Sequence, residues 1–152
     1  MTTHFSLSEA ANLSDPRFRL GMMREVVEHV HARGDLYMPL LNLVTTFIDG
    51  LAAGRPQATK KAYLQYIKTH FPALCAEIPA KEFYENYRNG AVHEFSLKDG
   101  YGIGRDTGMG GKYIITQTAR ETGRTYKVLN IDRLVADFVA HVRALEAALP
   151  PA

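Results

Sequence analysis

The pattern of this chain changes at one stretch, Phe83-Tyr84-Glu85-Asn86-Tyr87-Arg88-Asn89-Gly90-Ala91-Val92-His93-Glu94-Phe95. The stretch carries four aromatic rings, two acids, an arginine and a histidine. The sequence before it has the apolar periodicity of helices, and much of the sequence after it alternates as strands do, before one closing helix. We expect any chemistry of this protein to lie here, around Arg88, Asn89 and His93.

Length and composition are typical of one domain of ordinary size, spanning residues 1–152. Such a chain can bury roughly two thirds of the surface that it exposes when unfolded. Its single cysteine, Cys75, excludes an internal disulfide, fits a reducing cytoplasm, and lies in an apolar setting that predicts a buried structural thiol. The formal net charge of +2 is small for a protein that binds nucleic acid tightly by charge, so RNA contacts would be local or assembled by a dimer.

Two features argue against a secreted or membrane protein. Residues 1–8 contain no basic residue ahead of an apolar run, which is not the pattern of a signal peptide. The longest apolar stretch, 36–53, is interrupted by Pro39, Asn42 and Asp49, and therefore predicts a buried helix rather than a membrane span. We expect a cytoplasmic protein without membrane contact.

Helices are predicted from residue 16 to residue 93, after a flexible arm at 1–12. Ser14-Asp15-Pro16 is typical of a helix start, and Gly34 of a helix end. The side chains expected to be buried on this first helix are Phe18, Met22, Met23, Val26, Val27 and Val30. The second helix follows Asp35 and is apolar on most of its circumference, which predicts a central position or a subunit interface.

A third helix is predicted over 58–71 and a fourth from about Ala80 to the neighbourhood of Gly90. The third has Tyr63 and Ile67 on its inner face. Its outer face carries three lysines, which form either a solvated surface or a small basic patch: Lys60, Lys61 and Lys68.

Residues 95–129 predict an antiparallel hairpin or a three-stranded sheet, because apolar residues alternate with polar ones and turn residues separate the runs. Glu121-Thr122-Gly123 suits the hairpin turn. The last helix is expected at 131–149, starting from Asn130 or Asp132. The predicted fold is therefore mainly α (α+β): about five helices, with a small antiparallel hairpin or sheet before the last one.

The segment from Arg88 through Asn89 to His93 resembles the motif of the HEPN superfamily, in which an arginine, four to six further residues and a histidine lie in a small helical bundle. Several members of that family are metal-independent RNA-cleaving enzymes, and they work as dimers that bring two copies of the motif together. The resemblance covers 16–93 and not 95–129. It implies a homodimeric HEPN-like endoribonuclease or RNA-binding protein in which these three residues form the catalytic site.

The residue types suit this chemistry on their own. RNA cleavage without a metal requires proton transfer, which His93 can perform, and a cation for the phosphate, which Arg88 can supply through a bidentate contact. Asn89 can orient the phosphate or the imidazole. In an unbroken α-helix, five residues separate Arg88 and His93 by about 140° around the axis and about 7.5 Å along it. Either the helix ends at Gly90 and lets His93 swing round, or the working pair comes from two subunits.

A structural interpretation stands beside the catalytic one. Arg88 would pair with Glu85 or with an acid on a neighbouring helix, and His93 would bond the last helix carbonyls. The protein would then be a non-catalytic dimeric helical interaction module.

We expect no metal site and no cofactor. His29 and His31 point in different directions on their helix, and the sequence offers no third ligand at suitable spacing. Six glycines between Gly100 and Gly111 precede a strand, whereas a phosphate-binding loop precedes a helix, so this segment predicts a flexible hairpin loop.

Overall fold

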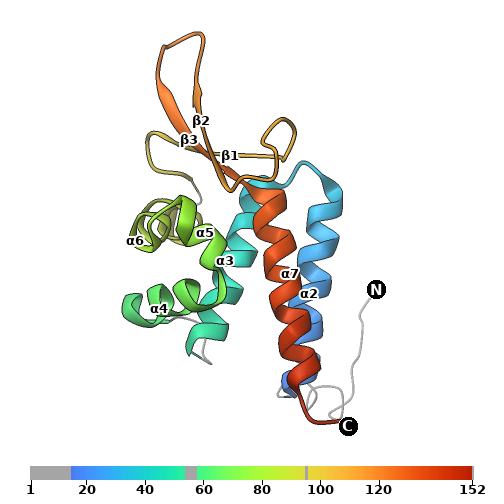
Figure 1. Ribbon diagram of the computed structural model, residues 1–152. Coiled ribbons are helices and arrows are strands. Elements are labelled where there is room, and N and C mark those ends of the chain that lie inside the picture. The colour runs from blue at the N-terminus through green and yellow to red at the C-terminus, as the bar shows by residue number, and fades with distance from the viewer. Residues whose placement is uncertain (1–14, 54–57, 95, 152) are drawn as a thin grey trace.

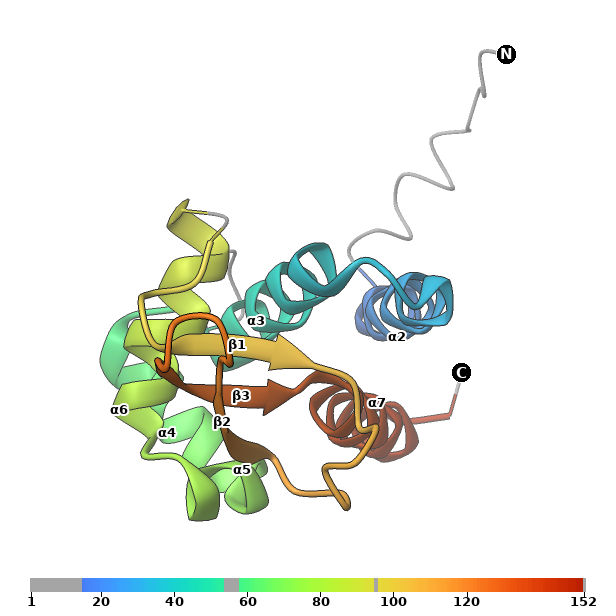
Figure 2. The ribbon, with the colours of Figure 1, turned by 90° about the horizontal axis from the view of Figure 1, so that it is seen from above.

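The computed structural model describes residues 15–53, 58–94 and 96–151, so the predicted arm at 1–12 lies outside the described residues. Helices make up most of this part of the chain, and a small sheet precedes the last helix (Figure 1). The predicted fold class is confirmed. Helices α2 and α7 lie side by side, α3 crosses the interior, and α4 to α6 lie on its other flank (Figures 1 and 2).

Helix α2 spans Pro16–Arg33 and has the predicted ends. The Asp15 side chain caps it by accepting from the Arg17 N–H at 3.0 Å. Gly34 closes it with φ 78°, a left-handed conformation that glycine adopts without strain.

The predicted buried side of α2 is partly wrong. Leu20 and Val27 are buried against the body of the protein, whereas three members of the predicted row are among its exposed large apolar residues: Phe18, Met22 and Val26, at 44%, 39% and 37% exposure. Two apolar rows therefore run along this helix. Only one of them can face α7 and α3.

Helix α3, Tyr37–Ala53, is central as predicted. Leu40, Leu41, Val44 and Ile48 are at most 2% exposed. Its apolar circumference is largely used inside the chain, because α2, α4 and α7 all pack against it. The apolar character of this helix is thus explained without a subunit interface.

The next helices are α4, Lys60–His70, α5, Pro72–Glu77, and α6, Ala80–Phe83. Helix α4 is capped by Thr59, whose hydroxyl accepts from the Ala62 N–H at 3.2 Å. The predicted fourth helix does not end near Gly90. Helix α6 instead continues into two π-helical segments, η1, Tyr84–Arg88, and η2, Gly90–Glu94.

Gly90 is required by the close approach of the chain that follows η2. A Cβ atom at this position would lie 2.4 Å from the Ser96 carbonyl oxygen. The Ser96 N–H also returns to donate to the Gly90 carbonyl at 3.0 Å. A glycine that looked like a helix end is therefore a packing requirement inside a continuing helix.

The sheet contains β1, Tyr101–Gly104, β2, Ile114–Thr118, and β3, Thr125–Asn130, in the order β1-β3-β2 (Figure 2). Strands β2 and β3 form the predicted antiparallel hairpin, with Gly123 at φ 68° in its turn. The prediction of a purely antiparallel sheet is wrong, because β1 pairs parallel to β3. Strand β3 lies between β1 and β2. It runs parallel to β1 and antiparallel to β2.

Helix α7 spans Ile131–Ala148 and is capped by Asn130, whose side chain accepts from the Arg133 N–H at 3.0 Å. Its buried stripe closes the core and consists of Ile131, Leu134, Val135, Phe138 and Val142. Cys75 is half-buried, and burial raises the pKa of its thiol. Within the described ranges, none of the helices combines the length and apolar character that a membrane crossing needs.

Candidate functional site

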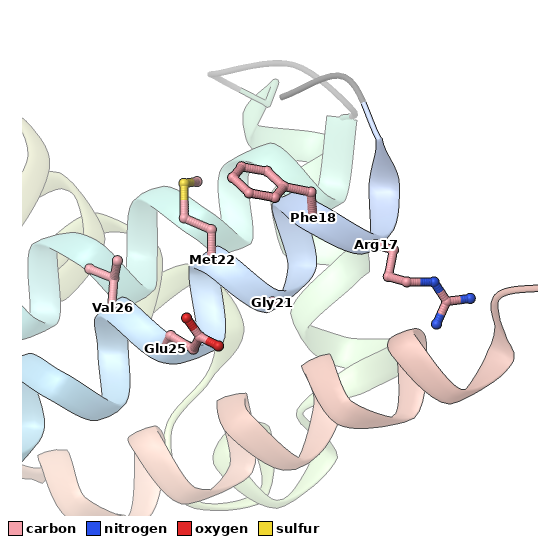
Figure 3. A pocket seen from close by; sticks show the side chains of 6 residues that line it. All are labelled: Arg17, Phe18, Gly21, Met22, Glu25 and Val26. Carbon is pink, nitrogen blue, oxygen red and sulfur yellow. The ribbon is translucent and has the colours of Figure 1, made fainter. Parts of the chain in front are cut away.

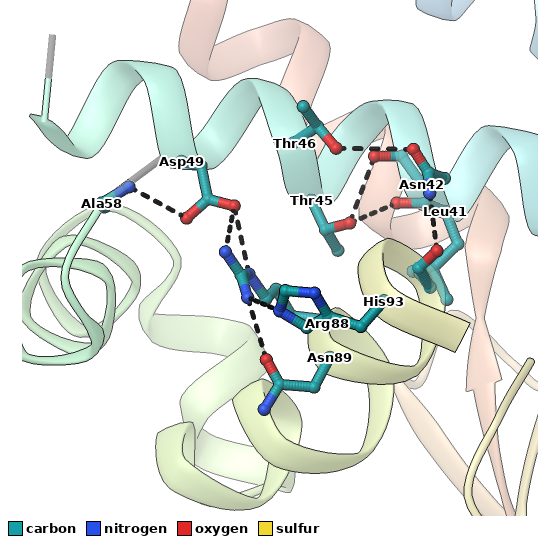
Figure 4. A network of polar contacts seen from close by, with 10 residues as sticks. Leu41, Asn42, Thr45, Thr46, Asp49, Ala58, Arg88, Asn89 and His93 are labelled. Atoms are coloured by element: carbon teal, nitrogen blue, oxygen red, sulfur yellow. Dashed lines mark hydrogen bonds and ion pairs between the residues drawn. The ribbon is translucent and has the colours of Figure 1, made fainter. Parts of the chain in front are cut away.

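The two π-helical segments bring Arg88 and His93 together. In π-helical geometry the hydrogen bonds run from residue i to residue i+5, so a residue five positions later lies about one turn further along the same side. The Asn89 N–H accordingly donates to the Tyr84 carbonyl, five residues earlier. Arg88 Nη1 lies 3.1 Å from His93 Nε2 (Figure 4). The helix does not need to end at Gly90, and a second subunit is not needed to join these two side chains.

Arg88 is a buried cation with a dedicated partner on α3. Its Nε and Nη2 atoms donate to Asp49 Oδ2 at 3.1 and 2.8 Å (Figure 4). The two side chains are 1% and 2% exposed. The guanidinium carbon also lies 5.0 Å from the ring centre of Tyr84 and 5.8 Å from that of Tyr63, so π faces surround the charge.

The ion pair between Arg88 and Asp49 is one of the two pairings that the structural interpretation of the sequence allowed. Arg88 pairs with an acid on a neighbouring helix, and that acid is Asp49. Glu85 instead lies 2.7 Å from Lys60 Nζ and 3.9 Å from Lys81 Nζ. The lysine face of α4 is therefore partly neutralised beside the site.

The remaining donors of Arg88 reach the two other predicted site residues. Nη1 donates to Asn89 Oδ1 at 2.9 Å and to His93 Nε2 at 3.1 Å. Because a guanidinium has no acceptor, Nε2 must be the unprotonated nitrogen and the neutral ring carries its proton on Nδ1. His93 is exposed and Asn89 half-buried. The accessible group of the predicted site is thus an imidazole whose tautomer is set by a buried cation.

A second contact from α3 fixes the π-helical backbone. Asn42 Nδ2 donates to the Ala91 carbonyl at 2.6 Å, and Thr46 Oγ1 lies 3.4 Å from Asn42 Oδ1 (Figure 4). Asn42 and Asp49 are seven residues apart, two turns of the same face. Sequence reasoning treated both as interruptions of an apolar stretch. Polar residues at this spacing in an otherwise apolar helix were the available signal.

The site also contains a polar atom without a partner. Within the part of the chain that the structure describes, Tyr63 Oη is the one buried side-chain oxygen or nitrogen that makes no hydrogen bond. Burial, and then the nearby Asp49 carboxylate, raise the pKa of this hydroxyl well above its ordinary value. Tyr63 therefore stays neutral, and its role beside Arg88 is to pack.

Other candidates from the sequence lie in different networks. His31 Nε2 is 2.6 Å from Asp132 Oδ1, and Arg105 Nε is 2.8 Å from the same oxygen. Among the described residues, no cluster of three or more His, Cys, Asp or Glu side chains is arranged to hold a metal ion.

Comparison with known proteins identified no relative of this chain. No family model matches the chain, and no curated protein or solved structure matches it. Any function must therefore be argued from the residues of the site.

Proposed function

We propose that this protein is HEPN-like and acts on RNA, as a metal-independent endoribonuclease or an RNA-binding protein, with Arg88, Asn89 and His93 as its site. The observation that supports the proposal is the 3.1 Å contact between an exposed imidazole and a buried guanidinium. The contact is made by π-helical backbone, which is rare in proteins and frequent at functional sites. The structural interpretation accounts for Arg88, which forms an ion pair with Asp49. It gives no reason for His93 to contact the Arg88 guanidinium.

The reaction would use the atoms that now bond each other. A phosphate that displaces the imidazole from Arg88 Nη1 would receive that N–H on a non-bridging oxygen. His93 Nε2, released from its bond, would take the proton of the 2′-hydroxyl, which attacks phosphorus as the bond to the 5′ oxygen breaks. The 5′ oxygen must gain a proton, and the second copy of His93 in the expected homodimer, in its protonated imidazolium form, would supply it. The products are a 2′,3′-cyclic phosphate and a 5′-hydroxyl end.

The test compares wild type with His93→Ala on mixed RNA in the presence of a metal chelator. We expect cleavage to fall by about 10²- to 10⁴-fold, the usual contribution of a proton-transferring side chain. His29→Ala is the matched control, because His29 is an exposed histidine on α2. Unchanged cleavage in His93→Ala, or none by wild type, would refute the catalytic proposal.

Arg88→Lys separates charge from geometry. Lysine keeps the positive charge and loses the planar fork, so cleavage should fall while weak RNA binding persists. Because Arg88 is 1% exposed, the unfolding of this variant must be measured beside its activity. Loss of cleavage in a variant that folds as wild type does would support a role in the reaction.

A second candidate function, a non-catalytic dimeric interaction module, is favoured by one observation. Phe18, Met22 and Val26 project from α2 beside a shallow groove of about 290 Å³ that includes Gly21 (Figure 3). Both candidates predict a homodimer with an interface above about 1,000 Å². If the exposed row forms it, Met22→Ser should yield a monomer by light scattering with the fold retained. A wild-type monomer at micromolar concentration would contradict both candidates.

A further inference from the structure

Two histidines meet where the end of α4 touches α7. The ring centres of His70, on α4, and His141, on α7, are 4.7 Å apart. Tyr66, one turn before His70, places its hydroxyl 2.6 Å from His141 Nε2. The uncharged ring of Phe71 completes the cluster, 5.4 Å from the ring centre of His141. One phenol, two imidazoles and one phenyl ring therefore lie together where these two helices meet.

The cluster holds no counter-charge. Among the described residues, no carboxylate forms a hydrogen bond or an ion pair with the imidazole of His70 or of His141. In the same part of the chain, no charged side chain of α2 or α3 forms a hydrogen bond or an ion pair with His141. His141 is half-buried, and burial, followed by the nearby His70, lowers the pKa of its imidazole. Burial raises the pKa of Tyr66 to about 12, so that phenol stays neutral at any ordinary pH.

We propose that the contact of His70 with His141 is a pH-sensitive joint, which releases the C-terminal end of α4 from α7 in mildly acidic solution. Protonating both rings would place two like charges against each other without an acid to compensate them. It would also put a proton on both ring nitrogens of His141, so that Nε2, which lies 2.6 Å from the Tyr66 hydroxyl, could only donate to it. This inference is independent of the proposed action on RNA.

The direction of the pH effect follows from linkage. A histidine whose pKa is lower in the folded state binds protons more weakly there than in the unfolded chain. The contact is therefore fully stable above about pH 6.5, the ordinary histidine value, and weakens as the pH falls below it. Each unit by which the pKa is lowered corresponds to about a tenfold change in the opening equilibrium.

The joint is connected to the candidate site through α4. Tyr63 lies one turn before Tyr66 on this helix and packs beside Arg88. Opening at His70 would therefore loosen a wall of the site. The joint can nevertheless be tested without RNA, by following the backbone of α4 itself.

Amide hydrogen exchange at pH 7.5 and pH 5.5, corrected for intrinsic exchange rates, tests the joint. In wild type we expect the opening of the α4 amides to increase severalfold at the lower pH, with α2 amides much less affected. The His70→Gln and His141→Gln double variant should lose this increase, because glutamine can still hydrogen-bond to Tyr66, as donor or acceptor, and does not titrate. His29→Gln, which replaces an exposed histidine on α2, should behave as wild type.

Two outcomes would overturn the inference. One is an α4 opening that does not increase at pH 5.5 in wild type. The other is an increase that persists in the double variant. If the double variant does not fold, His70→Gln alone decides the matter, because this exposed position tolerates glutamine and its replacement should reduce the increase.

Discussion

Replacing Asp49 by alanine tests whether the buried ion pair holds the site together. Asp49 is the acid that compensates Arg88, and the two side chains are 2% and 1% exposed. Removing one member of a buried pair leaves an uncompensated charge and costs about 3–5 kcal/mol. For a chain of 152 residues this loss corresponds to a melting temperature lower by roughly 10 °C. Asp49→Ala should therefore be among the most destabilising single changes in this protein.

Urea denaturation of a double-mutant cycle measures the pair itself. Asp49→Leu and Arg88→Met should each be strongly destabilising alone, and together they should cost much less than their sum, because no charge then remains buried. Glu85→Ala is the matched control. Its carboxylate is exposed and pairs with Lys60 on the surface, so little change is expected.

Two results would refute this reasoning. A loss below about 1 kcal/mol for Asp49→Ala would mean that Arg88 is solvated or has another partner. Additive effects of Asp49→Leu and Arg88→Met would mean that the two groups do not interact, since contacting residues normally show a coupling energy.

Three further predictions concern packing and charge. Gly90→Ala places a Cβ 2.4 Å from a backbone oxygen and should lower the unfolding free energy by about 1–3 kcal/mol, whereas Gly21→Ala, which meets nothing within 4 Å, should raise it by about 0.5–1 kcal/mol. Tyr63→Phe removes a buried unpaired hydroxyl and should raise the stability by about 1 kcal/mol; a loss would reveal a partner for the hydroxyl. Burial raises the pKa of Asp132, but hydrogen bonds, that of His31 first, lower it overall. The stability that the ionised Asp132 carboxylate contributes to the fold is thus present above its ordinary pKa and is lost as the pH falls through its lowered pKa. The urea midpoints of wild type and Asp132→Asn should therefore converge in strong acid.

Local sequence signals were sufficient for most of the helical ends and for the hairpin. The caps at Asp15 and Asn130 and the turn at Gly123 act within a few residues of themselves, and the sequence shows both partners. The buried side of α2 could not be predicted in the same way. Periodicity locates apolar rows, but the choice between two rows depends on which neighbouring helix packs against them.

The candidate site could likewise be predicted only where its residues are close together in the sequence. Arg88, Asn89 and His93 could be found because they lie within one short motif. The acid that compensates Arg88 could not, because 39 residues separate it from the arginine and several acids were available. The parallel pairing of β1 was hidden for the same reason, since it depends on where β3 enters the sheet.

The π-helical geometry gives the strongest reason to treat the motif as a functional site. The π-helix is rare, occurs mostly as single turns, and is frequent at functional sites. Within the described ranges, both π-helical segments lie inside the stretch that contains Arg88 and His93. A regular α-helix would turn these two side chains about 140° apart, whereas the observed geometry joins them at 3.1 Å. The chain keeps a less favourable backbone where it aligns a histidine with a buried cation, and departures of this kind from local preference are expected at functional or strained sites.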